Sequence, residues 1–483
     1  MNEHKAKSIV KTMNVSISTR VEKDSIGEID IIASAFWGSQ TERSRRFFNI
    51  GEELMPSAII RSLIIIKRVA AKTNASLGCL DNAIAKAIIK ACDHLLDDFD
   101  RYAMQFPLKV WQTGSGTQSN MNVNEVIANL ANHQLGSALG SKSPVHPNDH
   151  VNFGQSSNDC FPTAMHLATV LEVHEHLLPS LTTLWRSLDK KAKEFASILK
   201  IARTHLQDAT PMTVGQEFSS FARQIELGIE RIHMCLDGVR ALAQGGTAVG
   251  TGLNTHKNFA VQFAANLNHY FDDKYSFRTS SNTFEALATH DALVQFSGSL
   301  NTLAVSFMKI GNDIRLLGSG PRAGLNELCL PENEPGSSIM PGKVNPTQAE
   351  ALTMIAAHVM GNHATVTIAG SQGQLQLNVF KPVIAYNILQ SIKLLGDVAQ
   401  SFSKHCVEGI ALNKNQLQHN LSQSLMLITS LNTVIGYDNA AKVAKKAHKE
   451  GLSLKEAALA LGVISEKDYD THVDASKMLE PFD

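Results

Sequence analysis

The feature that most constrains the fold is a proline-free, nearly uncharged stretch at residues 282–317. Its centre, HDALVQFSGSLNTLAVSFMKIG, carries almost no charge between Asp291 and Lys309. A helix over the whole stretch would be roughly 50 Å long, which exceeds what one small domain can cover. A helix that is apolar all round must be buried on all sides. The stretch therefore predicts a bundle of long helices, either shared between subunits or contained in one large monomer.

Helical periodicity recurs through most of the chain, and there is little strand pattern. The first apolar repeat at three- and four-residue steps covers 57–100. Further long helices are predicted at 163–195, 215–243, 346–363 and 382–408. From about Leu412 the sequence becomes charged and amphipathic over short segments, which predicts a small separate helical domain.

Composition excludes several classes of protein. The 483 residues hold 44 Lys+Arg against 45 Asp+Glu, so the basic excess typical of proteins that bind nucleic acid or membrane surfaces is missing. No apolar run approaches the roughly 18 residues that a membrane span needs. The first residues, MNEHKAKSIVKTMN, have lysines but no apolar core, so we expect a flexible leader rather than an export signal. Six scattered cysteines without CxxC or metal spacing favour a reducing, cytoplasmic location and no metal site.

Polar loops interrupt the helices. They read TGSGTQSN, HPNDHVN, GQSSND, ARTHLQDATP, GGTAVGTGLNT and GSSIMPGKVNP. Each could be an ordinary surface turn. However, all lie at the ends of long apolar helices, where a bundle brings loops together, and loops on a rigid scaffold often carry function.

The loop GSSIMPGKVNP has two possible interpretations. It is not a phosphate-binding P-loop, because five residues separate Gly336 from Gly342 and Val344 replaces the Ser or Thr that would bind magnesium. Pro346 suits a first helical position. Asn345 with Gln348 forms a capping-box-like pattern, so Lys343 would lie at a helix N-terminus, where an anion is favoured. Taken alone, the loop is either a capped turn with an exposed lysine or a carboxylate site.

The remaining chemistry is modest. His205 lies in a non-helical stretch, and a lone histidine is more often structural than catalytic. His146 and His150 are four residues apart, but Pro147 between them argues against a metal site on a helix. No serine-hydrolase elbow, HExxH or GxGxxG is present. One lysine, one histidine and many hydroxyls and amides suit the binding of small carboxylates and the transfer of protons.

Taken together and in order, these motifs resemble the fumarase/aspartase superfamily, and within it the class II (iron-independent) fumarases. The loops above, VEKDSIGEID near the start, LQLNVFKPVIAYNILQS and GYDNAAKVAKKAHKEGLSLKEAAL follow the fumarase pattern from about Arg20 to Met478. Aspartase-like chains are similar but carry Gln at the position of His205. The sequence departs from the pattern at Phe153 and Gly154, where Lys-Ser is usual, and at Ala202, where Gly is usual.

The resemblance implies an all-α, three-domain fold with a central long-helix bundle assembled in a homotetramer, each active site drawing on three subunits. The expected domains are 1–155, 156–411 and 412–483. The implied activity is the reversible hydration of fumarate to (S)-malate, by anti addition of water through an aci-carboxylate, with no cofactor. The expected partners are a small dicarboxylate and further copies of the chain, with no nucleic acid and no membrane. The alternatives are aspartate ammonia-lyase or a catalytically silent structural member of the superfamily.

The resemblance also assigns roles to residues. Ser337 would be the base that removes the C3 proton, and His205 would act through a water on the other side of the substrate. Lys343 with Asn345 would stabilise the aci-carboxylate, and Glu350 would orient His205. The remaining substrate-binding residues would be Ser115, Thr117, Ser156, Ser157, Asn158 and Thr204. A second, peripheral anion site would use His146, Asn148 and Asp149.

Overall fold

The computed structural model describes residues 18–336 and 338–481, so the predicted leader and Ser337 lie outside the described residues. The prediction of an all-α chain is confirmed: long helices dominate, and each sheet found in this part of the chain has only two strands. The chain forms two compact units. The first comprises residues up to Glu172, Cys235–Ser297 and His363–Gln390, and the second comprises Val173–Met234, Gly298–Asn362 and the residues from Ser391. The three predicted domains stay a prediction.

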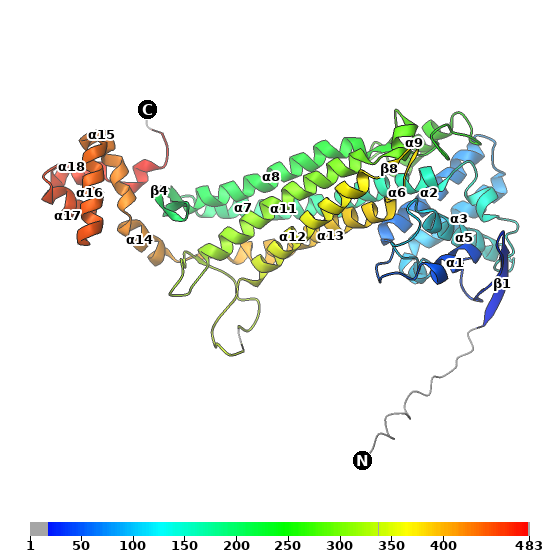
Figure 1. The fold of residues 1–483 in the computed structure, drawn as a ribbon, viewed down its shortest axis with the longest axis horizontal. Coiled ribbons are helices and arrows are strands. Elements are labelled where there is room, and N and C mark those ends of the chain that lie inside the picture. Colours follow the sequence, from blue (N-terminus) through cyan, green and yellow to red (C-terminus); the bar gives the residue numbers. More distant parts are fainter. Residues whose placement is uncertain (1–17, 337, 482–483) are drawn as a thin grey trace, which may run out of the picture. The chain divides into compact units, whose positions relative to one another are not determined.

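The first unit is built around α2 (Ser57–Ser76), which packs against α3, α5, α6 and α9 (Figure 1). Ile59, Leu63 and Ile66 on α2 are completely buried, as its run of aliphatic residues requires. The other helices of the unit are α1 (Ser39–Phe47), α3 (Asn82–Asp97), α4 (Phe99–Tyr102), α5 (Thr117–Gln134), α6 (Ser157–Glu172), α9 (Phe259–Tyr270) and α10 (Thr283–Ala288), with a π-helix at Pro147–Val151. The helical pattern predicted at 57–100 is thus confirmed, with a break where Asp81 caps α3.

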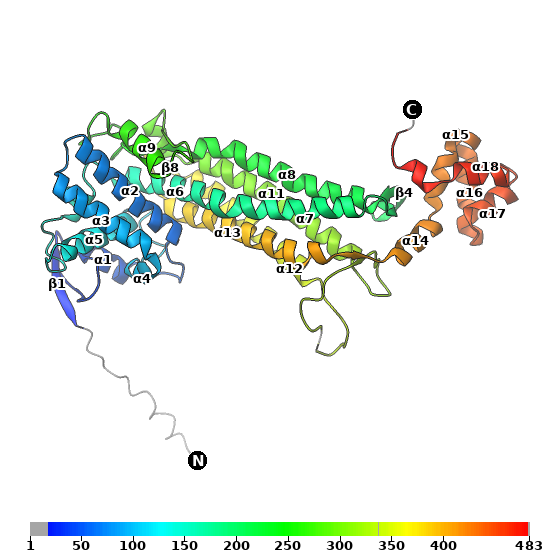
Figure 2. The same ribbon diagram turned by 180° about the vertical axis from the view of Figure 1, so that it is seen from behind.

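The second unit contains a bundle formed by α7 (Leu178–Glu194) and the neighbouring stretches of four longer helices, which run alongside each other in both views (Figures 1 and 2). The four are α8 (Val214–Val239), α11 (Asp291–Leu317), α12 (Thr347–Gly370) and α13 (Lys381–His405). Each of them contributes residues to both units. Contacts within the bundle are close: the hydroxyls of Ser187 on α7 and Ser403 on α13 lie 2.7 Å apart, and the rings of Phe195 and Phe218 lie 5.6 Å apart.

Two helix predictions were wrong in detail. The stretch 282–317 is not one helix, because Asn282 caps the short α10 and Thr289 takes an extended conformation before α11 begins. The helix predicted from residue 163 begins earlier, at Ser157, and includes Pro162. Proline inside a helix removes one backbone hydrogen bond. Here Thr163 Oγ1 donates to the Asp159 carbonyl at 2.7 Å, which supplies a hydrogen bond in the same turn.

The predicted capping box at the start of α12 was also wrong. The helix begins at Thr347, and the backbone N–H groups of Ala349 and Glu350 bond to the Pro346 carbonyl. The side-chain oxygen of Gln348 instead accepts a hydrogen bond from Ser401 on α13, at 3.0 Å. The Gln348 side chain therefore makes a contact between two helices of the bundle, whereas the local pattern predicted that it caps α12.

Two hairpins were missed because their strands are short. They are β1 (Thr19–Asp24) with β2 (Gly27–Ile32), and β3 (Leu199–Thr204) with β4 (Gln207–Thr213), both antiparallel. The other strands have two residues each: β5 (Ala241–Leu242), β6 (Arg278–Thr279), β7 (Leu328–Cys329), β8 (Gly373–Gln374), β9 (Leu377–Asn378) and β10 (Ala411–Leu412). The β3–β4 hairpin matters most here, because it carries Thr204 at the end of β3 and His205 at its turn.

The residues after Leu412 form short helices with a hydrophobic cluster of their own. The helices are α14 (Lys414–Gln423), α15 (Asn432–Ile435), α16 (Tyr437–Glu450), α17 (Leu454–Ala460) and α18 (Glu466–His472). Leu431, Val443 and Ala457 are completely buried in this cluster. Within residues 18–336 and 338–481, no helix is both long enough and apolar enough to cross a membrane.

Candidate active site

Three hydroxyl groups are joined in the first unit. Ser115 Oγ lies 2.8 Å from Thr117 Oγ1, which lies 2.6 Å from Ser157 Oγ. Thr117 is the first residue of α5 and Ser157 is the first residue of α6. The start of a helix presents free N–H groups and a partial positive charge. The arrangement thus places three hydrogen-bonding hydroxyls at two helix ends that both favour an anion.

Two glycines allow the loop that carries Ser115. Gly116 has φ = 76°, a left-handed conformation that side chains rarely adopt, and a β carbon there would collide with the ring of Phe161. A β carbon on Gly114 would overlap the carbonyl of Val379. The loop therefore packs closely against the buried ring of Phe161 and the backbone of Val379, which fixes the position of the hydroxyl groups.

The buried carboxylate of Asp159 holds the SSND loop in place. One carboxylate oxygen accepts from the Ser156 N–H at 2.9 Å, and the other accepts from the N–H groups of Gly245 and Thr247, each at 2.9 Å. Burial raises the pKa of Asp159 to about 6, although these N–H donors oppose the shift. The side chain of Asn158 donates to the Ala248 carbonyl at 2.8 Å. The Asp159 carboxylate thus connects the predicted substrate-binding loop SSND to the loop GGTAVG by hydrogen bonds.

Asp159 was not among the predicted site residues, although it stands in the SSND motif. The buried Lys67 was also missed. Its ammonium group donates to Asn152 Oδ1 at 2.8 Å and Gln155 Oε1 at 3.2 Å, beneath the same loop. A lysine inside the apolar run LIIIK was the only sequence signal for it.

The residues of the predicted second anion site lie at the start of the π-helix. The Nδ1 atom of His146 accepts from the backbone N–H of Asn148 at 3.2 Å and of Asp149 at 3.1 Å. A nitrogen that accepts cannot also donate, so the Asp149 carboxylate at 3.3 Å is not its hydrogen-bond partner. The structure therefore brings the three predicted residues together, with His146 acting as a helix cap.

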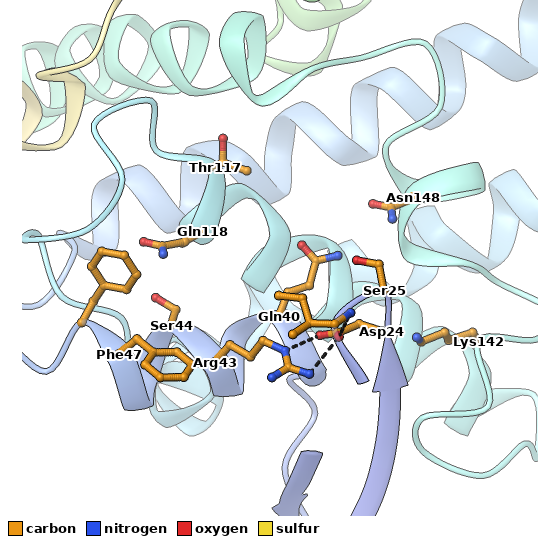
Figure 3. Close-up of a pocket in the computed structure, with 12 residues that line it drawn as sticks. Asp24, Ser25, Gln40, Arg43, Ser44, Phe47, Thr117, Gln118, Lys142 and Asn148 are labelled. Carbon is orange, nitrogen blue, oxygen red and sulfur yellow. Dashed lines mark hydrogen bonds and ion pairs between the residues drawn. The ribbon is translucent and has the colours of Figure 1, made fainter. Parts of the chain in front are cut away.

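A pocket of about 590 Å³ in the first unit reaches residues of both predicted sites. Figure 3 shows Thr117 and Asn148 among the residues that line it, together with Arg43, which is joined to Asp24. Arg43 Nε and Asp24 Oδ2 lie 2.7 Å apart, and this hydrogen bond lowers the pKa of Asp24 to about 2. Lys142 donates to the carbonyl of Lys23 at 2.8 Å. Both cations of the pocket are therefore already engaged with groups of the chain.

His205 occupies the two-residue turn of the β3–β4 hairpin in the second unit. Thr204 pairs with Gln207 across the hairpin, and His205 and Leu206 between them have φ values of 57° and 60°. Positive φ at both central residues is typical of a type I′ turn, which usually contains Asn and Gly. His205 and Thr204 are exposed, and no hydrogen bond or ion pair links the His205 side chain to another described residue.

The loop GSSIMPGKVNP precedes α12 in the same unit. Its ends approach each other, because a β carbon on Gly336 would overlap the Lys343 carbonyl. Lys343 and Glu350 are exposed and Asn345 is half-buried. No hydrogen bond or ion pair in the described part of the chain joins His205 to Glu350 or Lys343. The structure thus joins Ser115, Thr117 and Ser157 directly, but leaves the predicted catalytic residues of the second unit separate.

Comparison with known protein families agrees with these motifs. A family model described as "Lyase" matches residues 27–361, and one described as "Fumarase C C-terminus" matches 427–480. The fumarate hydratase class II of Rickettsia bellii is 60% identical over 460 residues, covering 95% of this chain and 98% of that protein. The fumarate hydratase class II of Methylorubrum extorquens is 57% identical over 468 residues, covering 97% and 98%.

Solved structures are similar over nearly the whole chain. The class II fumarase of Schistosoma mansoni has a TM-score of 0.94 at 45% identity and covers 96% of this chain and 100% of that one. A fumarate lyase:delta crystallin of Brucella melitensis has a TM-score of 0.91 at 40% identity, with the same coverage. The match extends through the loops that hold the joined hydroxyls, His205 and Lys343. The chain therefore belongs to the class II fumarate hydratases.

Proposed function

We propose that the chain hydrates fumarate to (S)-malate reversibly, at a site in which the joined hydroxyls of Ser115, Thr117 and Ser157 bind substrate carboxylate. The observation that carries this proposal is the position of these hydroxyls at the starts of two helices. Each hydroxyl donates one hydrogen bond and accepts two. Each O–H can therefore turn from its neighbour toward a carboxylate oxygen, and the helix ends add favourable partial charge. Ser156, Asn158 and Thr204 complete the proposed contacts with the substrate.

In the dehydration direction the substrate is malate. Ser337, as its alkoxide, removes a proton from C3, which creates a dianionic aci-carboxylate. Lys343 and Asn345 stabilise this charge where it develops, which is the interaction that accelerates such steps most. The aci-carboxylate then collapses to the C2–C3 double bond as the hydroxyl leaves. His205 delivers a proton to the leaving oxygen through a water, so that water departs, and Glu350 orients His205. Hydration follows the same steps in reverse.

We propose that the active chain is a homotetramer whose sites combine residues from different copies. Apolar residues on the long helices of the second unit support this assembly. Met234 on α8 is 70% exposed, Val305 on α11 is 53% exposed and Met354 on α12 is 67% exposed. Large exposed apolar patches mark protein–protein interfaces, and these three side chains come from neighbouring helices of one bundle (Figures 1 and 2). Light scattering of the purified protein tests the proposal, and a monomer that retains full activity would contradict it.

We also propose that His146, Asn148 and Asp149 form a second anion site. Support comes from the exposed Asn148, which lies on the wall of the same pocket as Thr117. Titration calorimetry with malate should find two classes of site per chain in the wild type and one in Asn148→Ala.

A cytoplasmic location is proposed because all six cysteines are free. Cell fractionation tests it.

A single experiment separates the candidate activities. The purified protein is incubated with fumarate, with and without ammonium, and products are followed by NMR. Malate as the only product supports the proposed hydration. Aspartate formed in ammonium would instead indicate an ammonia-lyase, and unchanged fumarate would indicate a silent structural member of the superfamily.

A further inference from the structure

Four charged side chains meet at the base of the hairpin that carries His205. Lys200 Nζ on β3 lies 2.8 and 2.7 Å from the two carboxylate oxygens of Glu217, which is in the first turn of α8. It also lies 3.1 Å from Glu327 Oε2, as an ion-pair contact. Arg203 on β3 places Nη2 at 2.6 Å from Glu327 Oε1. Two cations of one strand are therefore neutralised by two carboxylates from other segments.

Glu327 occupies the centre of this cluster and is 1% exposed. Its Oε1 also accepts from the side chain of Asn420 on α14, at 3.1 Å. Its backbone N–H donates to Leu317 at the end of α11, and its carbonyl accepts from the Asn413 N–H. One residue thus connects β3, the end of α11 and the first helix after Leu412. It directly precedes β7, from which the chain continues into the loop GSSIMPGKVNP.

The carboxylate of Glu327 is ionised in this setting. Burial by itself raises its pKa, but the hydrogen bond from Arg203 and the charges of Lys200 and Arg203 outweigh burial and hold the pKa below its usual value. Removing one partner of a buried ion pair leaves the other charge without compensation. The position of Arg203 therefore depends strongly on Glu327.

His205 itself has no such support. No hydrogen bond or ion pair links its side chain to another described residue, and it is exposed at the tip of the turn. Its location is therefore set by the backbone of the hairpin. Arg203 lies two residues before His205 on β3, and its side chain is held by an ion pair with the buried Glu327. Lys200 provides a second attachment on the same strand.

We propose that Glu327 is a positioning residue for the reaction, which acts through Arg203 to fix the hairpin that presents His205. The proposal rests on the proposed role of His205. Glu327 itself does not touch the substrate. Displacement of a catalytic group by about 1 Å can lower turnover roughly 100-fold, so loss of this anchor should lower kcat rather than substrate affinity.

The test compares Glu327→Gln with Glu450→Gln. The control makes the same substitution at Glu450, an exposed carboxylate on α16 that pairs with Lys446. Malate formation gives kcat and KM, and thermal unfolding gives Tm. Glu327→Gln should lower kcat about 10- to 100-fold while KM changes less than about threefold. The control should match the wild type. A Glu327→Gln protein with a lower Tm but wild-type kcat would overturn the proposal, because the residue would then be structural only.

If Glu327→Gln does not fold, Arg203→Lys tests the same ion pair from its other partner. Lysine keeps the charge at this site but loses the planar fork of arginine. The expected result is a fall in kcat of about fivefold or more with unchanged KM, and a wild-type kcat would again overturn the proposal. If both variants fold, the double variant Glu327→Gln/Arg203→Lys should be no slower than the slower single variant, since both act through one contact. A wild-type protein that makes no malate would refute the proposed function instead.

Discussion

The two units of the chain hold their predicted site residues in opposite ways. In the first unit, hydrogen bonds join Ser115, Thr117 and Ser157, and the buried Asp159 accepts from the backbone N–H of the neighbouring Ser156. In the second unit, His205, Lys343 and Glu350 are exposed, and no hydrogen bond or ion pair in the described part of the chain joins them to one another. The hydroxyl groups of the first unit are thus preformed within a single chain. The positions of the predicted catalytic side chains of the second unit depend on the backbone that carries them.

This difference indicates that the first unit binds substrate carboxylate and that the second unit supplies the groups that transfer protons. Groups that bind an unchanging part of the substrate, such as a carboxylate, gain from being held rigidly before binding. Groups that move protons must approach the reacting carbon closely, and residues exposed at loops can be brought there by assembly or loop closure. The contrast between the two units therefore predicts different kinetic effects for substitutions in each.

The largest effect is expected at Ser337, in the loop of the second unit. Ser337→Ala removes the proposed base and should lower kcat about 10⁴-fold, with the tetramer and helix content retained. Malate dehydration followed at the absorbance of fumarate measures it. Ser338→Ala is the matched control and should keep most activity. Equal losses in the two variants would show that the loop needs both serines for its shape, and that Ser337 is not a specific base.

His205→Asn should produce the next largest effect. Asparagine keeps hydrogen-bonding capacity and suits a left-handed turn, but it cannot transfer a proton near neutral pH. We expect kcat to fall about 10³-fold with little change in Tm. Stopped assays for malate and thermal unfolding measure both. A loss of less than about tenfold would remove His205 from the mechanism.

A smaller effect of a different kind is expected in the first unit. Thr117→Val removes the central hydroxyl without changing the shape of the side chain. A hydrogen bond to a charged group contributes about 1.5–3 kcal/mol, so KM should rise about 10- to 100-fold, with a smaller change in kcat. Thr163→Val is the matched control, since its buried hydroxyl donates to the Asp159 backbone carbonyl and, among the described residues, to no other group. If Thr117→Val changed kcat alone, the contrast between binding and proton-transfer regions would fail.

The smallest effect concerns stability and compares the buried lysines of the two units. Lys200 has two carboxylate partners, whereas Lys381 is completely buried with the Asn378 carbonyl as acceptor and no carboxylate partner in the described part of the chain. Burial lowers the pKa of Lys381 from 10.5 to about 7. Between pH 7 and about 10 the unfolded chain binds a proton that the folded chain lacks, so the free energy of unfolding rises with pH there.

Lys381→Met should abolish this contribution. Chemical denaturation at pH 7, 8, 9 and 10 should show the wild type gaining stability relative to the variant as the pH increases. Lys449→Met, at an exposed lysine on α16, is the control and should give a constant difference from the wild type. A constant difference for Lys381→Met as well would mean that Lys381 carries the same charge in the folded and unfolded chain.

Most of the helical fold was predictable because long apolar periodicities depend on local sequence. What failed was decided by contacts between distant residues. Gln348 bonds to Ser401 on another helix, and α6 begins before Pro162, where Asp159 holds two loops. The hairpin of His205 was missed because strands of six and seven residues carry little periodic signal.

The site was predictable in composition but not in geometry. The polar loops identified the hydroxyl and amide residues, yet nothing local showed that Thr117 and Ser157, forty residues apart, would touch. Glu327 and Lys67 were missed for the same reason, since a buried charge is recognised only by its partners. The predicted roles of Ser337, His205, Lys343 and Glu350 rest on the resemblance to the fumarase family.

The turn that carries His205 has a consequence for how this chain can change. Both of its residues bear side chains in a left-handed conformation, which costs about 1–2 kcal/mol for each residue. Glycine at Leu206 would relieve part of that cost, so the chain retains a turn that is less stable than it could be. Because the loop has only two residues, adding or deleting one would shift the pairing of β3 with β4 and turn the histidine to the other face. Homologous chains that keep a histidine here should therefore tolerate sequence change in this turn but not changes in its length.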